Sequence, residues 1–64
     1  MDEIYVKEFI ALRNTFYDSY IDVRNRALDK ANCFLSMHTG YKVLNIIEEW
    51  NADKTVLTLI VYYC

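Results

Sequence analysis

The last part of the chain is apolar on both sides of an extended strand. Residues 56–63, VLTLIVYY, contain one polar side chain, that of Thr58. Side chains alternate along a strand, so one face carries Val56, Thr58, Ile60 and Tyr62, and the other carries Leu57, Leu59, Val61 and Tyr63. Both sets are apolar, which predicts a strand that needs a hydrophobic layer on each side.

The clearest periodic signal lies between Tyr20 and Met37. Apolar side chains recur there every three or four residues, which predicts one stripe of an amphipathic helix. The stripe consists of Tyr20, Val23, Ala27, Leu28, Ala31, Phe34 and Leu35. The other side carries the charged residues Asp22, Arg26, Asp29 and Lys30. We expect that side to face solvent, with Asp22 paired to Arg26 four positions later.

Polar residues bound this helix at both ends. The pairs Thr15 with Asp18 and Ser19 with Asp22 both have the spacing of a capping box, in which two residues satisfy the free amides of a helix start. Gly40 follows the helix and is expected to take the left-handed conformation that ends many helices.

Two further segments are typical of strands. Residues 3–12, EIYVKEFIAL, are rich in β-branched and aromatic side chains, although a helix continuous with the next segment is the alternative. Residues 41–50, YKVLNIIEEW, are joined to the last strand by the polar turn 51–54, which predicts a hairpin. The predicted fold is a single α+β domain over residues 1–64, with the order β-α-β-β and one helix packed on one face of a three-stranded sheet.

One helix is too narrow to cover both faces of this sheet. Three strands make a sheet about 14 Å wide and about 30 Å long, and a helix about 10 Å across covers one face almost completely. The other face has a footprint of about 400 Å², the upper end of what a soluble monomer exposes as one apolar patch. We expect this face to pack on a copy of itself in a homodimer or larger closed assembly. The alternative is a monomer whose second face is tyrosine-rich and wet, or covered by the N-terminal residues.

The length and composition of the chain agree with a need for outside support. A chain of 64 residues buries only about 60% of its unfolded surface, so its stability is marginal without disulfides, a metal or oligomerisation. Cys33 and Cys64 are the only cysteines, so free thiols are expected rather than a disulfide framework. Neither a secretory signal nor a membrane span is predicted, since the N-terminus is acidic and the final apolar run is too short. A cytoplasmic location is therefore expected.

No motif predicts catalysis or metal binding. Cys33, His38 and Cys64 are the only soft ligands, whereas a structural zinc site uses four in paired spacing. Cys33 and His38 are five positions apart on a helix and point to different sides, and the neighbours Glu48 and Glu49 face opposite ways on a strand. The predicted protein is therefore not an enzyme, and no catalytic, cofactor-binding or metal-binding residue is assigned.

Aromatic residues are unusually frequent in so short a chain. It has six tyrosines, three phenylalanines and one tryptophan, and tyrosine and tryptophan anchor many protein interfaces. The formal net charge is -2 and the final strand has no base, so nucleic acid is not an expected partner. The predicted interface residues, for self-association or a partner, are Tyr17, Tyr20, Tyr41, Trp50, Leu57, Leu59, Val61, Tyr62 and Tyr63.

The segments YVKEF (residues 5–9), ALDKANCFL (27–35) and LTLIVYY (57–63) together resemble a small family of β-α-β-β proteins associated with sporulation in Bacillus-type bacteria. This resemblance covers most of the chain and implies the fold, with no catalytic residue. The same element order is similar to dodecins, cytosolic flavin-storage proteins that assemble into hollow shells. That second resemblance implies a flavin stacked on a strand tryptophan, for which Trp50 is the only candidate.

Two functional hypotheses follow, from different classes. The leading one is a small homo-oligomer without a cofactor that binds and inhibits or adapts a partner protein, as phage-encoded inhibitors of host proteins of this size do. The alternative is a ligand-sequestering oligomer that holds a flavin or nucleotide in an aromatic pocket between subunits.

Overall fold

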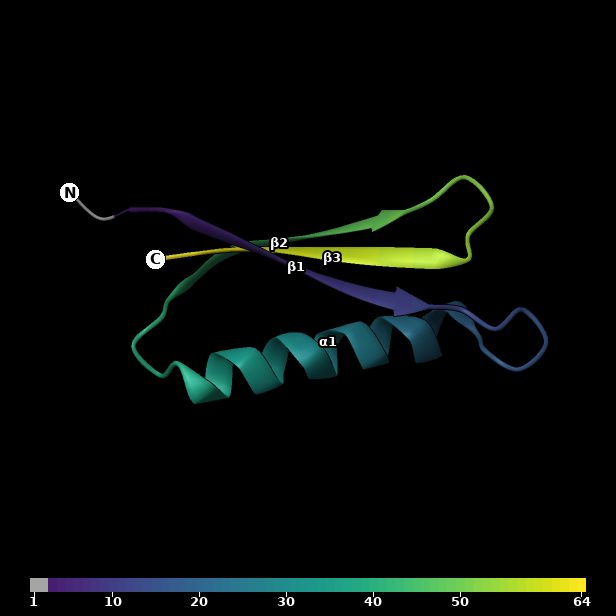
Figure 1. Ribbon diagram of the computed structural model, residues 1–64, viewed down its shortest axis with the longest axis horizontal. Coiled ribbons are helices and arrows are strands. Elements are labelled where there is room, and N and C mark those ends of the chain that lie inside the picture. Colours follow the sequence, from purple (N-terminus) through teal and green to yellow (C-terminus); the bar gives the residue numbers. More distant parts are fainter. Residues whose placement is uncertain (1–2) are drawn as a thin grey trace.

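The computed structural model describes residues 3–64 as three strands and one helix (Figure 1). In chain order these are β1 (Tyr5–Leu12), α1 (Tyr20–Met37), β2 (Val43–Trp50) and β3 (Val56–Tyr63). The α+β prediction is confirmed, because the strands form one antiparallel sheet with α1 packed on one face. The helix and β3 have the predicted bounds, whereas β1 and β2 each begin two residues later than expected.

The most apolar strand lies in the middle of the sheet. The strand order is β1-β3-β2, and β3 runs antiparallel to both neighbours, so β1 and β2 run parallel to each other. Phe9 of β1 and Glu48 of β2 are both opposite Leu59. The chain therefore passes from β1 through α1 to the far edge of the sheet, and β3 then fills the space between the two edge strands.

The core lies between β3 and α1. Leu57, Leu59 and Val61 of β3 are fully buried, and Val23 and Ala27 of α1 pack against them. The buried set is completed by three more residues, Ala11, Ala31 and Tyr63. Since alanine is small, it allows the helix and the sheet to approach closely, but it contributes little buried apolar area. The result is a thin core for a domain of this length.

The start of α1 confirms one of the two predicted caps. The backbone N–H of Asp22 donates to Ser19 Oγ at 3.2 Å, and the backbone N–H of Ser19 donates to Asp22 Oδ2 at 3.1 Å. Asp18 does not form the alternative box with Thr15, because its carboxylate instead accepts from the backbone N–H of Asn14 at 2.9 Å. The segment before the helix is thus a closed turn that delivers Ser19 to the cap position.

The end of α1 differs from the prediction. Gly40 was expected to be left-handed, but no glycine of residues 3–64 has a positive φ. The helix ends instead at His38, whose φ is -129° and whose backbone N–H donates to the Leu35 carbonyl at 3.2 Å. A tightened last turn satisfies the terminal carbonyl, so a left-handed residue is not needed there.

The only left-handed residue among those described is Lys54, with φ 61°, in the turn between β2 and β3. Asn51 Oδ1 closes this turn by accepting from the backbone N–H groups of Thr55 and Val56, each at 2.9 Å. The Thr55 hydroxyl donates to Asp53, and this bond lowers the pKa of the Asp53 carboxyl. These contacts hold the hairpin whose position the sequence predicted.

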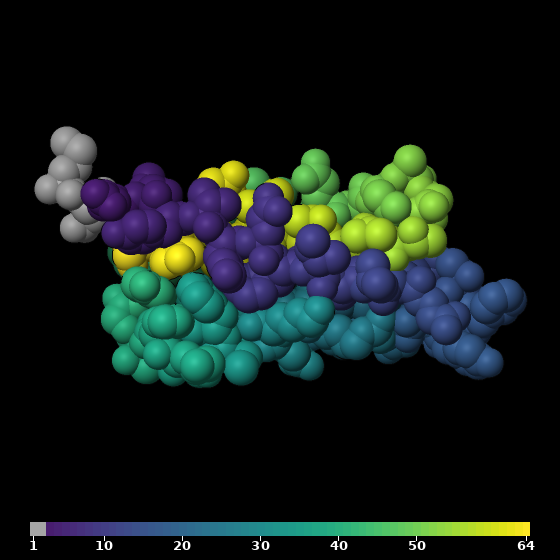
Figure 2. Space-filling view, viewed as in Figure 1, coloured from purple at the N-terminus to yellow at the C-terminus, as the bar shows by residue number. Residues whose placement is uncertain are grey.

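The helix covers less of the sheet than its dimensions suggested. It packs on β1 and β3, and within residues 3–64 no Cα atom of α1 comes within 8 Å of β2. The space-filling view shows the second half of β1 lying directly on the helix (Figure 2). The expectation that one helix covers nearly a whole face is therefore wrong, because α1 is displaced toward one edge and leaves β2 outside the layer.

Leu59→Ala tests the core. The substitution is expected to lower the free energy of unfolding by about 2–5 kcal/mol, because Leu59 has no exposed surface and truncation leaves a cavity. Urea unfolding followed by circular dichroism measures the change. The control is Ile21→Ala on the exposed side of α1, where the side chain is 68% exposed and a change of less than about 0.5 kcal/mol is expected. Equal losses in the two variants would contradict the assigned core.

Candidate functional site

The face of the sheet opposite α1 carries apolar side chains from all three strands. The strand register places Ile10 beside Thr58, and Ile47 beside Ile60, on this face. We call it the open face and define it by Val6, Ile10, Leu12, Ile47, Val56, Ile60 and Tyr62. The side chains of the edge strands are well exposed, from 41% for Ile47 to 68% for Leu12. A large apolar surface of a single chain is thus left in contact with water.

The open face has a simple charge pattern. Glu8 lies opposite Ile60, and Glu49 lies opposite Thr58, so two carboxylates flank the apolar centre. Within the three strands, no lysine or arginine shares this face, since Lys7 pairs with buried Val61 on the helix side. The open face is therefore apolar in the middle and acidic at its two edges.

Four of the predicted interface residues lie elsewhere. Leu57, Leu59, Val61 and Tyr63 are buried beneath α1, at exposures of 0%, 0%, 0% and 8%. The prediction assigned these residues to an interface because alternation alone does not reveal which side of a strand the helix occupies. The structure corrects this assignment: α1 takes that side, and the alternate residues of β3 belong to the open face.

The remaining predicted residues are divided among three places. Tyr62 is half-buried on the open face, and Tyr17 is 85% exposed in the connection from β1 to α1. Tyr20 and Trp50 meet edge to face, with their ring centroids 5.3 Å apart, and the guanidinium of Arg13 lies 4.2 Å from the Tyr20 ring centroid. Trp50 thus links the hairpin end of β2 to the start of the helix.

Tyr41 belongs to an aromatic cluster at the other end of α1. Its ring lies 4.7 Å from that of Tyr63 and 5.2 Å from that of His38, measured between centroids. Phe34 lies against both His38, at 4.7 Å, and Tyr63, at 5.6 Å. These rings fill the region where the helix passes into the segment leading to β2. These ring contacts join the end of the helix to the sheet, so we assign the cluster a structural role.

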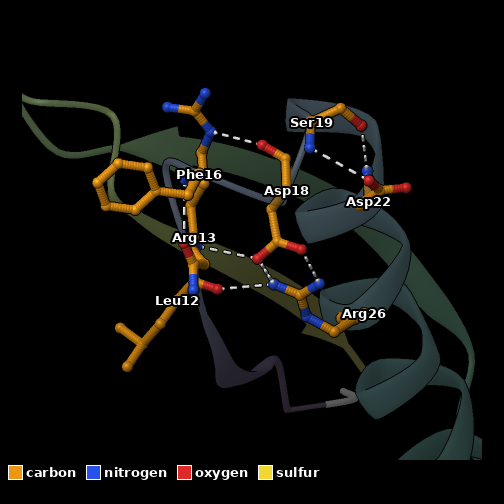
Figure 3. A network of polar contacts seen from close by, with 8 residues as sticks. Leu12, Arg13, Phe16, Asp18, Ser19, Asp22 and Arg26 are labelled. Atoms are coloured by element: carbon orange, nitrogen blue, oxygen red, sulfur yellow. Dashed lines mark hydrogen bonds and ion pairs between the residues drawn. The ribbon is translucent and has the colours of Figure 1, made fainter.

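Two cations of the helix donate to backbone carbonyls in the second half of the free edge of β1. The Arg13 N–H donates to the Thr55 carbonyl at 2.7 Å, which sets the alternation so that the carbonyls of Ile10 and Leu12 point away from β3. Lys30 Nζ donates to the Ile10 carbonyl at 2.5 Å. Arg26 Nη2 donates to the Leu12 carbonyl at 2.7 Å (Figure 3).

These contacts correct the expectation that this side of α1 only faces solvent. They arise because the helix runs beside the edge strand. The predicted Asp22–Arg26 pair is replaced by a fork from Arg26 to both carboxylate oxygens of Asp18, at 3.0 and 2.8 Å (Figure 3).

The free edge of β2 has no such protection. The Asn51 N–H donates to the Val56 carbonyl at 3.1 Å, so the backbone groups of Ile46, Glu48 and Trp50 point away from β3. Within the part of the chain that the structure describes, one of these groups has a partner: the Ile46 N–H donates to Asn45 Oδ1 at 2.9 Å. The remaining outward groups are open to another strand.

Across residues 3–64 there is no pocket and no group of three or more His, Cys, Asp or Glu side chains that could hold a metal ion. Both cysteines are free, and Cys33 is exposed. Glu48 and Glu49 lie on opposite faces, as alternation predicted, and Glu48 forms an ion pair with Arg24 of the helix.

No protein-family model matches this chain, and neither a curated protein nor a solved structure is similar to it. Within residues 3–64, no helix combines the length and the apolar character that crossing a membrane requires.

The Asp18 carboxylate, in the turn before α1, accepts hydrogen bonds from both Arg26 and Asn14. Hydrogen bonds from the Arg26 guanidinium, and then from the Asn14 backbone N–H, lower the pKa of Asp18 from its usual value. The same bond raises the pKa of Arg26. Because the folded chain binds the Asp18 proton less tightly than the unfolded chain does, the stabilisation is present above the unfolded pKa and is lost as pH falls through the folded pKa.

Asp18→Asn is therefore expected to flatten the acid side of the stability profile. The urea midpoint of the wild type should fall as the pH drops from neutral to below ~3.9, and part of that fall should disappear in the variant. Asp29→Asn is the matched control, since Asp29 is an exposed aspartate of α1 whose side chain makes no hydrogen bond within residues 3–64. A variant profile as steep as that of the control would contradict the assignment.

Proposed function

We propose that this protein is a non-enzymatic, homo-oligomeric interaction protein that binds a partner protein through the open face and thereby inhibits or adapts it. The observation that supports this proposal is the distribution of apolar side chains. Among residues 3–64, fifteen large apolar side chains are exposed, whereas the buried core has eight residues, three of them alanine. Four of the fifteen lie together on the open face: Val6, Ile10, Leu12 and Ile47. Monomeric soluble proteins rarely leave such surface uncovered, and an uncovered apolar patch marks an interaction site.

The size of the open face suits a protein rather than a small molecule. Strands of eight residues make a footprint of about 27 by 14 Å, or roughly 400 Å² before side-chain relief. A standard interface buries about 800 Å² per partner, with an apolar centre and a polar rim. The open face provides such a centre, and Glu8 and Glu49 provide an acidic rim. It is also flat, whereas small ligands are held in concave sites.

The negative charge of that rim favours a different protein, rather than the open face of a second copy, as the occupant of the open face. Stacking two open faces brings Glu8 and Glu49 of both copies to one interface, and the three strands supply no base on that face to offset them. An apolar surface bordered by lysine or arginine side chains matches the pattern and is drawn to it electrostatically. We therefore propose a partner with an apolar ridge and basic flanks.

Ile10→Lys tests the open face. The substitution places a charge in the apolar centre of the face, on a side chain that is 50% exposed, so the fold should tolerate it. Tagged wild-type protein is expected to retain a specific protein from a native lysate of its source, and Ile10→Lys should lose that protein by at least roughly tenfold, because burying an unpaired ammonium is costly. Quantitative mass spectrometry of the retained proteins measures the loss.

Ile21→Lys is the matched control, with the same change on the exposed side of α1 at 68% exposure. It should retain the partner as the wild type does, and circular dichroism should show the same fold for both variants. Retention of no protein by the wild type, or equal retention by Ile10→Lys, would overturn the proposal.

A further inference from the structure

We propose that the free edge of β2 pairs antiparallel with β2 of a second copy, joining two sheets into one continuous six-stranded sheet. The inference deepens the proposed function, because it identifies the surface that makes the protein a homo-oligomer. It assigns self-association to a strand edge and leaves the open face free for the partner.

The two edges of the sheet are treated differently by the chain. On β1, Lys30 and Arg26 occupy the outward carbonyls of Ile10 and Leu12, which blocks the second half of this edge against further pairing. The outward groups of Val6 and Glu8, in the first half, have no partner within residues 3–64. On β2, the outward groups of Glu48 and Trp50 have no partner within residues 3–64. An unblocked edge of eight residues is a template for another strand.

The helix leaves room for that strand. Within residues 3–64 no Cα atom of α1 lies within 8 Å of β2, and the helix reaches that strand through the side chains of Tyr20 and Arg24, so its backbone leaves the free edge uncovered. With strands ~4.8 Å apart, a helix centred over β1 and β3 lies about 10 Å from the new two-fold axis. The two helices are then about 20 Å apart, and helices ~10 Å in diameter do not collide at that separation. The displacement of α1 from β2, which weakens the single chain, is what permits the pairing.

The register follows from the positions that face outward. Ile46, Glu48 and Trp50 have their backbone groups on the free edge, so a two-fold axis must pass through one of positions 46–50 for these groups to meet. An axis at Glu48 or Glu49 sets two carboxylates opposite each other, which is unfavourable. An axis at Trp50 brings only the Trp50 groups together. An axis at Ile46 pairs Glu48 with Leu44, which lies at the register shift near the start of β2, so only the Ile46 groups meet in a regular pair.

An axis at Ile47 satisfies the edge best. It places Ile47 against Ile47 of the second copy on the open face, and Asn45 against Glu49, an amide donor against a carboxylate. The backbone groups of Ile46 exchange hydrogen bonds with those of Glu48 in the other copy, which makes four bonds in all by symmetry. The Ile46 N–H gives up Asn45 Oδ1 for a backbone carbonyl, so no donor is lost.

Cysteine cross-linking tests this register. In an antiparallel pair that is not hydrogen-bonded, Cα atoms lie ~4.5 Å apart, within the range of a disulfide. In a background that carries Cys33→Ser and Cys64→Ser, Ile47→Cys is expected to form a covalent dimer on mild oxidation. Ile10→Cys is the control, an isoleucine of similar exposure on the same face but in the blocked half of β1, and it should stay monomeric on a denaturing gel. Cross-linking through Ile10→Cys and not through Ile47→Cys would overturn the proposal.

Glu48→Pro tests the edge without thiols. Proline removes an N–H that points away from β3, so it breaks no bond to β3 but removes two bonds of the dimer. Sedimentation over a range of concentrations should show a folded protein whose dimer dissociation constant has risen at least roughly tenfold. Glu48→Ala is the control: it removes the ion pair with Arg24 but keeps the N–H, and it should dimerise like the wild type.

Two outcomes contradict the edge proposal: a monomeric wild type at every concentration, or a Glu48→Pro variant that dimerises as the wild type does. A monomeric wild type would also contradict the homo-oligomeric part of the proposed function. Neither result affects the binding of a partner to the open face, which is tested by the loss of the partner from Ile10→Lys. In the converse case, Ile47→Cys cross-links into a dimer while the wild-type protein retains no partner from the lysate. That pair of results supports pairing through the edge of β2 and overturns the function proposed for the open face.

Discussion

The structure depends on the burial of β3 between an edge strand on each side and a helix above it. Its alternate residues Leu57, Leu59 and Val61 are fully buried, and they meet a helix face built on Val23 and Ala27. Because one strand supplies half of the core, the helix follows that strand, and within residues 3–64 its Cα atoms stay more than 8 Å from those of β2. The open face and the bare edge are both consequences of this choice.

A chain with so small a buried core still has a defined fold, because hydrogen bonds fix the segments that connect its helix and strands. Ser19 and Asp22 cap the helix, Asn51 closes the hairpin turn, and Arg26 ties the turn before α1 to the end of β1. These hydrogen bonds add little stability individually, but they set where each element starts. The residue at which each element begins is therefore specified locally, and the proposed association would supply free energy that the small core lacks.

The two proposed surfaces use different physics and different parts of the sheet. The open face offers apolar area with an acidic rim, which favours a partner of complementary shape and charge. The edge of β2 offers directional backbone groups, which only another extended strand can satisfy. Pairing two edges sets two open faces side by side, so a bivalent or elongated partner gains contacts on both copies. Ile47 and Glu49 belong to both proposed surfaces, and their side chains stay on the open face when two edges pair, because residues opposite each other in adjacent strands share a face of the sheet.

The sequence by itself determined the element order, the helix bounds, the Ser19 cap and the apolar character of both faces of β3, because these depend on local periodicity and on residue types. It did not determine which face α1 covers, so the buried residues Leu57 and Leu59 were assigned to an interface. It also placed Arg26 and Lys30 in solvent. Only the tertiary structure decided these points, because the sideways position of a helix on a sheet depends on packing between distant segments, and that position decides which edge strand is partly blocked.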